Sequence, residues 1–224
     1  MRVGTARVDT TPTEPIRLCG YAARHGLSEG VEQPISAKAL AIRAGKQPPA
    51  VLLSVELTAI PAVLTEHVAR QLYAKANEPR ERFVICCTHT HTAPCVDGAL
   101  PNMFGHALPA NQRAAIRRYT ERLLTDLESV ALSALECMQP AGLSYYEGKV
   151  AFGANRRTQN GPVDDALPVL VARNLEGKVL AVVVNCACHC TTLGTFNRVC
   201  GDWAGYAQQA IEADHPGSTA LVTI

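Results

Sequence analysis

The sequence predicts an α/β fold with a mixed, partly antiparallel sheet flanked by at least three helices. Three observations lead to this prediction. Short apolar runs rich in β-branched residues end at turn residues, which is the pattern of buried strands. Other stretches carry apolar residues at helical spacing. The 224 residues are 47% hydrophobic and 18% charged, which is the composition of a globular chain that buries a sizeable core.

The expected strands form two groups on either side of a long helix. The first group lies at residues 2–8, 37–44 and 50–56 and in the run that begins at Phe83. The second group lies at residues 143–152, 167–173, 179–188 and 219–224. Residues 174–178 contain Gly177 and are typical of a hairpin loop, so antiparallel pairing is expected in the second group.

Three helices are expected, at residues 61–76, 111–137 and 203–213. Pro61 is well placed in a first helical turn, and Pro140 ends the second helix. Asp202 precedes the third helix as a candidate N-cap. Three strands come before the first helix, so the chain lacks the regular strand–helix alternation of a (β/α)₈ barrel.

Composition and charge argue against several classes of partner. The net charge is +1, from 21 basic and 20 acidic residues, and no basic stripe is present, so no nucleic-acid partner is expected. No apolar run approaches the ~20 residues that span a bilayer, so no membrane span is expected. The start of the chain shows no signal-peptide pattern, and the nine cysteines are expected to be reduced thiols in a cytoplasmic protein.

Two of the apolar runs end in histidines. The run from Phe83 leads into His89 and His91, and the run 179–188 leads into His189. Positions i and i+2 of an extended backbone point to the same face, so His89 and His91 are predicted to project together. Loops at one end of a sheet commonly hold the active site of an α/β fold. We therefore predict that these strand ends meet in a metal or acid–base site.

Other candidate residues are open to more than one interpretation. Asp202 is a possible metal ligand, a residue that orients a histidine, or simply a helix cap. Cys188, His189 and Cys190, together with Cys186, are a possible structural zinc cluster, but the cysteines lack the C-x₂-C spacing of such sites. Arg156 lies in a polar, turn-rich segment and by itself indicates a solvated loop residue.

Six short motifs occur in a characteristic order along nearly the whole chain. They are Val8-Asp9-Thr10-Thr11-Pro12, Gly20-Tyr21, Thr88-His89-Thr90-His91-Thr92-Ala93-Pro94, Asn155-Arg156, Asn185-Cys186-Ala187-Cys188-His189 and Asp202 through Gly205-Tyr206. In this order the chain resembles the neutral/alkaline, non-lysosomal ceramidase family, in the N-terminal part of its catalytic domain. The two histidine motifs, taken together, are the most specific part of the resemblance.

The resemblance implies a zinc-dependent amidase that cleaves the N-acyl bond of ceramide-like lipids or related amides. It implies that His89 and His189 are zinc ligands. It also implies that His91 and Arg156 are catalytic residues, which act on the developing oxyanion, on proton transfer or on the polar head of the substrate. Asp202 would support the site near His189.

The family's further zinc ligands, a Glu and a Tyr, would come from later in the domain than Ile224. Residues 1–224 are therefore expected to form the N-terminal part of a single ceramidase-like catalytic domain. Two other functions remain open: a metallohydrolase of another fold and substrate class, and a non-catalytic binding module in which the histidines are structural.

Overall fold

The sheet has eight strands and is mixed, as the sequence predicts. The computed structural model describes residues 1–224, and its strands lie in the order β4-β3-β2-β1-β5-β6-β7-β8. The first half comprises β1 (Arg2–Asp9), β2 (Ser36–Arg43), β3 (Ala50–Val55) and β4 (Phe83–Cys87). The second half comprises β5 (Gln139–Lys149), β6 (Ala166–Asn174), β7 (Val179–Asn185) and β8 (Thr219–Thr223). Only the outermost pairs, β3 with β4 and β7 with β8, are parallel, which excludes a (β/α)₈ barrel.

The sheet bends between its halves, where β1 and β5 are paired only through Arg2 and Val3. The two halves fold over each other, and the Ser54 hydroxyl of β3 donates a hydrogen bond to the Val222 carbonyl of β8 at 2.6 Å. The space between the halves is filled by buried apolar residues, which are Val3, Leu40, Ala141, Ala172, Ala181 and Leu221.

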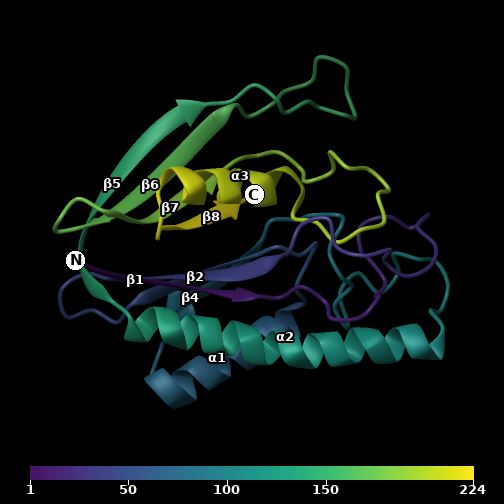
Figure 1. Cartoon of the computed structure of the whole chain (residues 1–224), viewed down its shortest axis with the longest axis horizontal. Helices are drawn as coiled ribbons and strands as arrows, with labels where there is room; N and C mark the ends of the chain where they lie inside the picture. Colours follow the sequence, from purple (N-terminus) through teal and green to yellow (C-terminus); the bar gives the residue numbers. More distant parts are fainter.

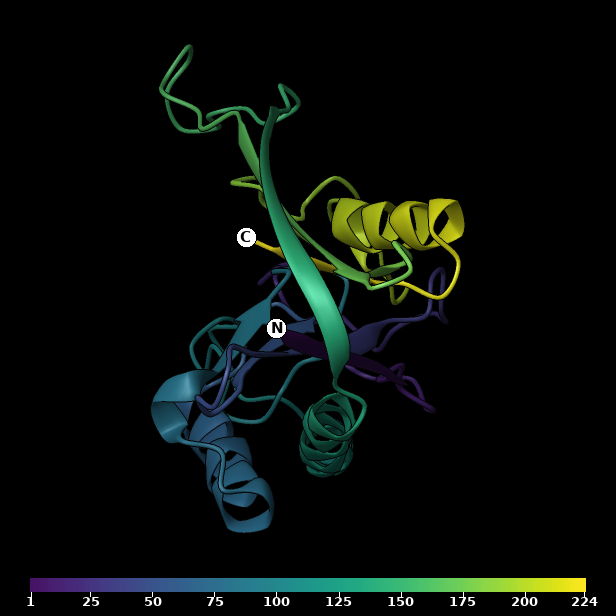
Figure 2. The same cartoon turned by 90° about the vertical axis from the view of Figure 1, so that its left-hand side faces the viewer.

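Three helices cover the outer faces of the folded sheet. They are α1 (Ala62–Ala76), α2 (Ala110–Glu136) and α3 (Asp202–Asp214). Helices α1 and α2 lie against the first half, and α3 lies against β8 of the second half (Figures 1 and 2). The molecule therefore has four layers, in the order helix, sheet, sheet, helix. None of the three helices carries an apolar stretch of the length that a bilayer crossing requires.

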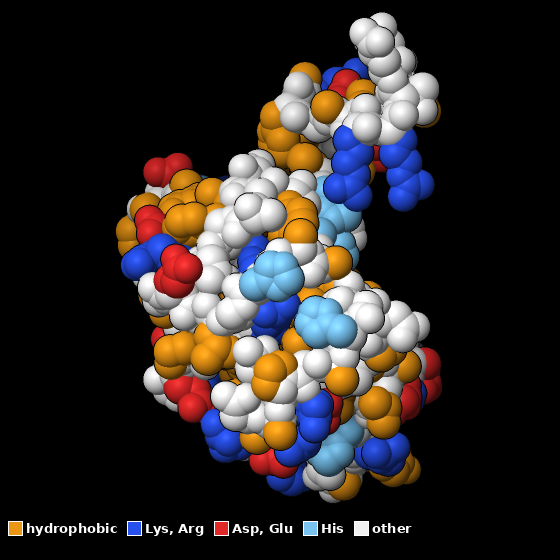
Figure 3. Space-filling model, turned by 90° about the vertical axis from the view of Figure 1, so that its right-hand side faces the viewer, with side chains coloured by type: hydrophobic (Ala, Val, Ile, Leu, Met, Phe, Trp, Pro, Cys, Tyr) orange, Lys and Arg blue, Asp and Glu red, His pale blue; other side chains and the backbone are white.

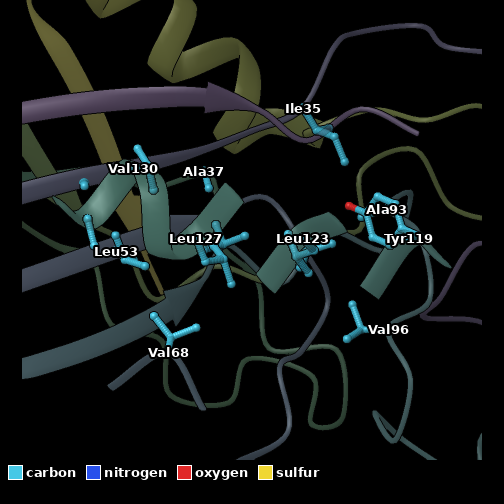
Figure 4. Packing of buried hydrophobic residues seen from close by; sticks show 14 of the residues in the cluster. Ile35, Ala37, Leu53, Val68, Ala93, Val96, Tyr119, Leu123, Leu127 and Val130 are labelled. Atoms are coloured by element: carbon cyan, nitrogen blue, oxygen red, sulfur yellow. The ribbon is translucent and has the colours of Figure 1, made fainter. Parts of the chain in front are cut away.

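The main core lies between the first half of the sheet and helices α1 and α2. It contains 26 buried apolar residues. Figure 4 shows Leu123, Leu127 and Val130 of α2 in one cluster with Leu53 of β3 and Val68 of α1. Burial of each such side chain contributes about 1.5–3 kcal/mol. The apolar spacing that predicts these helices is thus the surface that packs them against the sheet.

Several element boundaries differ from the sequence prediction. Strand β5 spans Gln139–Lys149 rather than 143–152, so Pro140 lies within this strand. Strand β7 ends at Asn185 rather than at residue 188, because the chain turns back on itself and the Cys188 N–H donates to the Cys186 carbonyl at 2.7 Å. Gly201, and not Asp202, occupies the N-cap position of α3. Asp202 is the first residue of the helix and has a left-handed φ of 56°.

Candidate metal centre

Four loops gather at one end of the molecule, on the right-hand side of Figure 1. They follow β1, β4, β5 and β7 and comprise residues 10–35, 88–109, 150–165 and 186–201. Two isolated β-bridges join the first of these loops to two others. Leu18 pairs with Pro94 of the loop after β4, and Val31 pairs with Val199 of the loop after β7. Segments that are far apart in the sequence thus surround one site.

His89, His91 and His189 form a compact cluster among these loops. The ring centroids are 5.0 Å apart for His89 and His91, 4.4 Å for His89 and His189, and 4.8 Å for His91 and His189. Their candidate ligand atoms lie within 4.8 Å of one another, and no other group of three or more His, Cys, Asp or Glu in residues 1–224 does so. Imidazole nitrogens that lie this close together are a candidate ligand set for one metal ion.

The two histidines of the His-x-His motif come together for a different reason than the sequence analysis gave. Strand β4 ends at Cys87, and His89 has a left-handed φ of 56°, so the spacing of an extended strand does not apply. Thr90 and Thr92 are fully buried, and their hydroxyls donate to the Cys200 carbonyl at 2.9 Å and 2.7 Å. These hydrogen bonds hold the threonines inward and leave the histidines on the side of the pocket.

The ring of His89 is oriented by a backbone group. Its Nδ1 lies 2.6 Å from the carbonyl oxygen of Thr58. A carbonyl only accepts hydrogen bonds, so Nδ1 carries the proton and Nε2 keeps its lone pair. Metal-binding histidines commonly have this second hydrogen bond. The sequence did not reveal Thr58 as a site residue, because its contribution comes from the main chain.

His91 lies between His189 and the loop that follows β1. Its Nε2 is 2.9 Å from Nε2 of His189, and its Nδ1 is shielded from solvent without a hydrogen-bond partner. Burial, together with the positive charge that His89, His189 and Arg156 would carry, lowers the pKa of His91 to about 4. Burial also lowers the pKa of His189. Both imidazoles are therefore held in the neutral form, in which a nitrogen is able to bind a metal or accept a proton.

Arg24 is a further residue of the site that the sequence analysis missed. Its guanidinium is 4% exposed and donates to the carbonyls of Cys19 at 2.6 Å, His91 at 2.9 Å and Phe196 at 3.0 Å. It also lies over the ring of Tyr21, whose edge meets His91. Arg24 thus joins three loops around His91, which no local sequence pattern indicates.

An open cavity of about 610 Å³ lies in front of the histidine cluster. Figure 3 looks onto this end and shows histidine side chains at a hollow, with basic side chains of an overhanging segment above it. Arg156 lies in the loop after β5 and lines the same cavity as the three histidines. His89 and His91 follow a strand of the first half of the sheet, whereas Arg156 and His189 follow strands of the second half. The lining residues are Gly20, Thr58, His89, His91, Leu100, Pro101, Asn102, Met103, Arg156 and His189.

Asp202 is not part of the histidine cluster. It is 1% exposed, and its carboxylate accepts hydrogen bonds from the Thr192 hydroxyl at 2.5 Å, the Leu193 N–H at 3.2 Å and the Trp203 N–H at 2.6 Å. It therefore binds the segment that follows His189 to the start of α3. All nine cysteines are free thiols, and Cys186, Cys188 and Cys190 do not form a metal cluster.

The fold and this cluster define an α/β protein with a candidate three-histidine metal centre in an open pocket. The sequence matches no protein-family model and no curated protein. Solved structures do match. The chain is similar to the crystal structure of neutral ceramidase from Pseudomonas aeruginosa, with 20% sequence identity and a TM-score of 0.82, over 99% of this chain and 38% of that one. It is also similar to a ceramidase complexed with C2, with 18% identity and a TM-score of 0.80, over 99% of this chain and 37% of that one.

The chain therefore has the fold of part of the neutral ceramidase structures, as the motif order implied. It spans a little more than a third of the length of each of the two ceramidase chains.

Proposed function

We propose that this chain carries metal-binding and catalytic residues of a zinc-dependent amidohydrolase that cleaves the N-acyl bond of ceramide-like lipids or related amides. The observation that carries the proposal is the histidine cluster at the open cavity, with Nδ1 of His89 bonded to a carbonyl and its Nε2 left free. The shared fold with neutral ceramidase structures supports the choice of substrate class.

His89 and His189 are the proposed metal ligands. Nε2 of His89 is the free nitrogen of a ring held by the Thr58 carbonyl. Nε2 of His189 lies at the cavity wall, 2.9 Å from His91. Imidazole nitrogens fit zinc, which accepts nitrogen ligands in a tetrahedral site. A bound zinc ion would polarise the amide carbonyl and lower the pKa of water near it.

His91 and Arg156 are the proposed catalytic residues. His91 is neutral at physiological pH because its pKa is lowered to about 4, so it is able to accept a proton from the attacking water. Arg156 faces the same cavity and carries a fixed positive charge, which would stabilise the oxyanion that develops on the amide carbonyl or bind the polar head of the substrate. Asp202 is the proposed supporting residue near His189, because its carboxylate holds the loop that follows this histidine.

Part of the cavity wall suits an apolar part of the substrate. Leu100, Pro101 and Met103 contribute apolar side chains there. A lipid amide would place its carbonyl at the histidines and its acyl chain along this wall.

We also propose a cytoplasmic location, which the nine free thiols favour because cytosolic cysteines stay reduced. Cell fractionation with an antibody against the chain tests this, and recovery of the protein only outside the cytoplasm would contradict it.

Metal analysis of the purified protein tests the metal site directly. We expect zinc in the wild type, loss of zinc in His89→Ala and His189→Ala, and retention of zinc in the matched control His215→Ala, which alters an exposed histidine at the end of α3. A wild type without zinc, or equal zinc in all four proteins, contradicts the proposal.

Release of fatty acid from N-acylsphingosine tests the chemistry. We expect hydrolysis by zinc-loaded protein and none by His89→Ala. Bound zinc with no cleavage of any N-acyl amide would instead indicate a non-catalytic module with a structural metal.

A further inference from the structure

Three sulfur-containing side chains lie near one another at the wall of the cavity, and the proposed hydrolysis uses none of them. Sγ of Cys19 lies 3.8 Å from Sδ of Met103. Cys95 lies on the segment paired with that of Cys19, because the Cys95 N–H donates to the Arg17 carbonyl at 2.8 Å. Cys19 and Cys95 are 2% and 5% exposed, so protein encloses both thiols, whereas Met103 is half-buried and lines the cavity.

The backbone holds the two thiols on one face of a short antiparallel ladder. Leu18 pairs with Pro94, and the ladder continues through the hydrogen bond from the Cys19 N–H to the Ala93 carbonyl at 2.9 Å. Cys19 and Cys95 are each one residue from this pair, so both side chains point to the face opposite Leu18. Cys19 and Cys95 are diagonal neighbours across the ladder rather than directly opposite each other. A disulfide requires a Cβ–Cβ distance of about 4 Å, and diagonal neighbours are farther apart than this.

The chemistry of the group is that of a soft-metal ligand set. We propose that Cys19, Cys95 and Met103 bind a monovalent soft cation of the Cu(I) class. Thiolate and thioether sulfurs select such ions over hard ones. With metal–sulfur distances of about 2.3 Å, two ligands of a trigonal site lie about 4 Å apart, which matches the 3.8 Å between Cys19 and Met103.

Protonation favours one of the two thiolates. The Cys95 thiol lowers the pKa of Cys19 to about 7, with smaller contributions from Thr58 and the Arg24 guanidinium. Cys19 therefore supplies a thiolate near neutral pH, which is the form that binds metals. The Cys19 side chain and burial raise the pKa of the Cys95 thiol, so Cu(I) has to displace the Cys95 proton to solvent when it binds. The two thiolates and one Cu(I) then carry a net charge of −1 beside Arg24.

The site is distinct from the histidine cluster but adjoins it. The N–H of Gly20 donates to Sδ of Met103 at 3.2 Å, and Gly20 packs against the ring of His91. A cation on the sulfur atoms would hold Met103 and Gly20 in place, and so would stiffen the wall on which His91 rests.

Anaerobic titration of zinc-loaded protein with Cu(I) against the chelator bicinchoninate tests the proposal. We expect the wild type to hold one Cu(I) more than Cys95→Ser, and Met103→Leu to bind that ion about tenfold more weakly. Cys137→Ser is the matched control, because Cys137 is an exposed thiol on a different part of the chain, and it should bind as the wild type does. X-ray absorption at the copper edge should show a coordination shell of sulfur alone.

Equal Cu(I) stoichiometry and affinity in the wild type, Cys95→Ser and Met103→Leu would overturn the proposal, as would nitrogen in the coordination shell. Met103→Leu keeps the side-chain size at a half-buried position, so it remains informative if Cys95→Ser does not fold. Zinc content is measured on the same samples, so failure of the histidine site and failure of the sulfur site are seen separately.

Discussion

Gly20 lies so close to His91 that a single methyl group at this position should separate catalysis from metal binding. Gly20 has a φ of +99°, and a Cβ at this position would lie 2.5 Å from Cγ of His91 and 2.7 Å from its Nδ1. Ordinary contact begins near 3.4 Å. The Gly20→Ala change therefore requires His91 to move by about 1 Å or the loop to open.

Two free-energy terms oppose this substitution. A left-handed backbone costs about 1–2 kcal/mol for a residue with a Cβ, and overpacking costs about 1–3 kcal/mol. Gly26→Ala is the matched control, because Gly26 belongs to the same loop, has a φ of +82° and has open space where its Cβ would lie. Gly26→Ala should therefore have only the free-energy cost of the left-handed backbone, without the cost of overpacking. The melting temperature of Gly20→Ala should fall below that of Gly26→Ala by about 2–4 °C for each kcal/mol of overpacking.

The activity assay separates the roles of the histidines. A displacement of about 1 Å at a catalytic group reduces the rate about 100-fold, so Gly20→Ala should lose amide hydrolysis by about this factor. Zinc content should remain, because the three atoms nearest to the added Cβ all belong to His91, which is not a proposed ligand. Wild-type hydrolysis in Gly20→Ala, with a melting temperature equal to that of Gly26→Ala, would refute the reasoning.

Three further predictions concern stability. Asp202→Ala leaves the partly buried N–H groups of Leu193 and Trp203 without their acceptor, so urea titration should show a loss of about 3 kcal/mol; a change below 1 kcal/mol would contradict this. Burial raises the pKa of Glu78 from 4.5 to about 7 in the folded chain. Between these pH values the folded chain holds a proton that the unfolded chain has lost, so stability should fall by up to about 3 kcal/mol as pH rises from 4.5 to 7. Glu78→Gln should remove this fall in urea titrations at pH 5 and pH 8, and an unchanged pH dependence would count against the burial argument. Leu127→Ala should lower the unfolding free energy by about 2–5 kcal/mol, since Leu127 is 0% exposed in the main core; a loss below 1 kcal/mol would show that the site collapses around the smaller side chain.

Local sequence patterns predicted nearly all helices and strands. The apolar spacing of α2 and the β-branched run of β7 are properties of neighbouring residues, so they are readable without a fold. Element ends were less accurate, because a chain leaves a strand where a local turn replaces the hydrogen bonds of the ladder. Cys186 to Cys188 show this, as the turn after β7 replaces three expected strand residues.

The candidate site was predictable in part. The positions of His89, His91 and His189 at the ends of apolar runs indicated a shared site, although the argument from an extended backbone was wrong for His89. Thr58 and Arg24 were not predictable, because a carbonyl and a buried guanidinium act on residues far from them in sequence.

The sequence by itself determined the class of fold, the order of strands and helices, and the residue types able to bind a metal, because these follow from periodicity, turn residues and side-chain chemistry along the chain. Only the tertiary structure decided that the sheet bends and closes on itself. It also decided which nitrogen of His89 is free, that Asp202 supports a loop instead of capping α3, and that sulfur-containing side chains lie near one another at the cavity wall. These features depend on contacts between segments distant in sequence, and the packing of the whole chain selects such contacts.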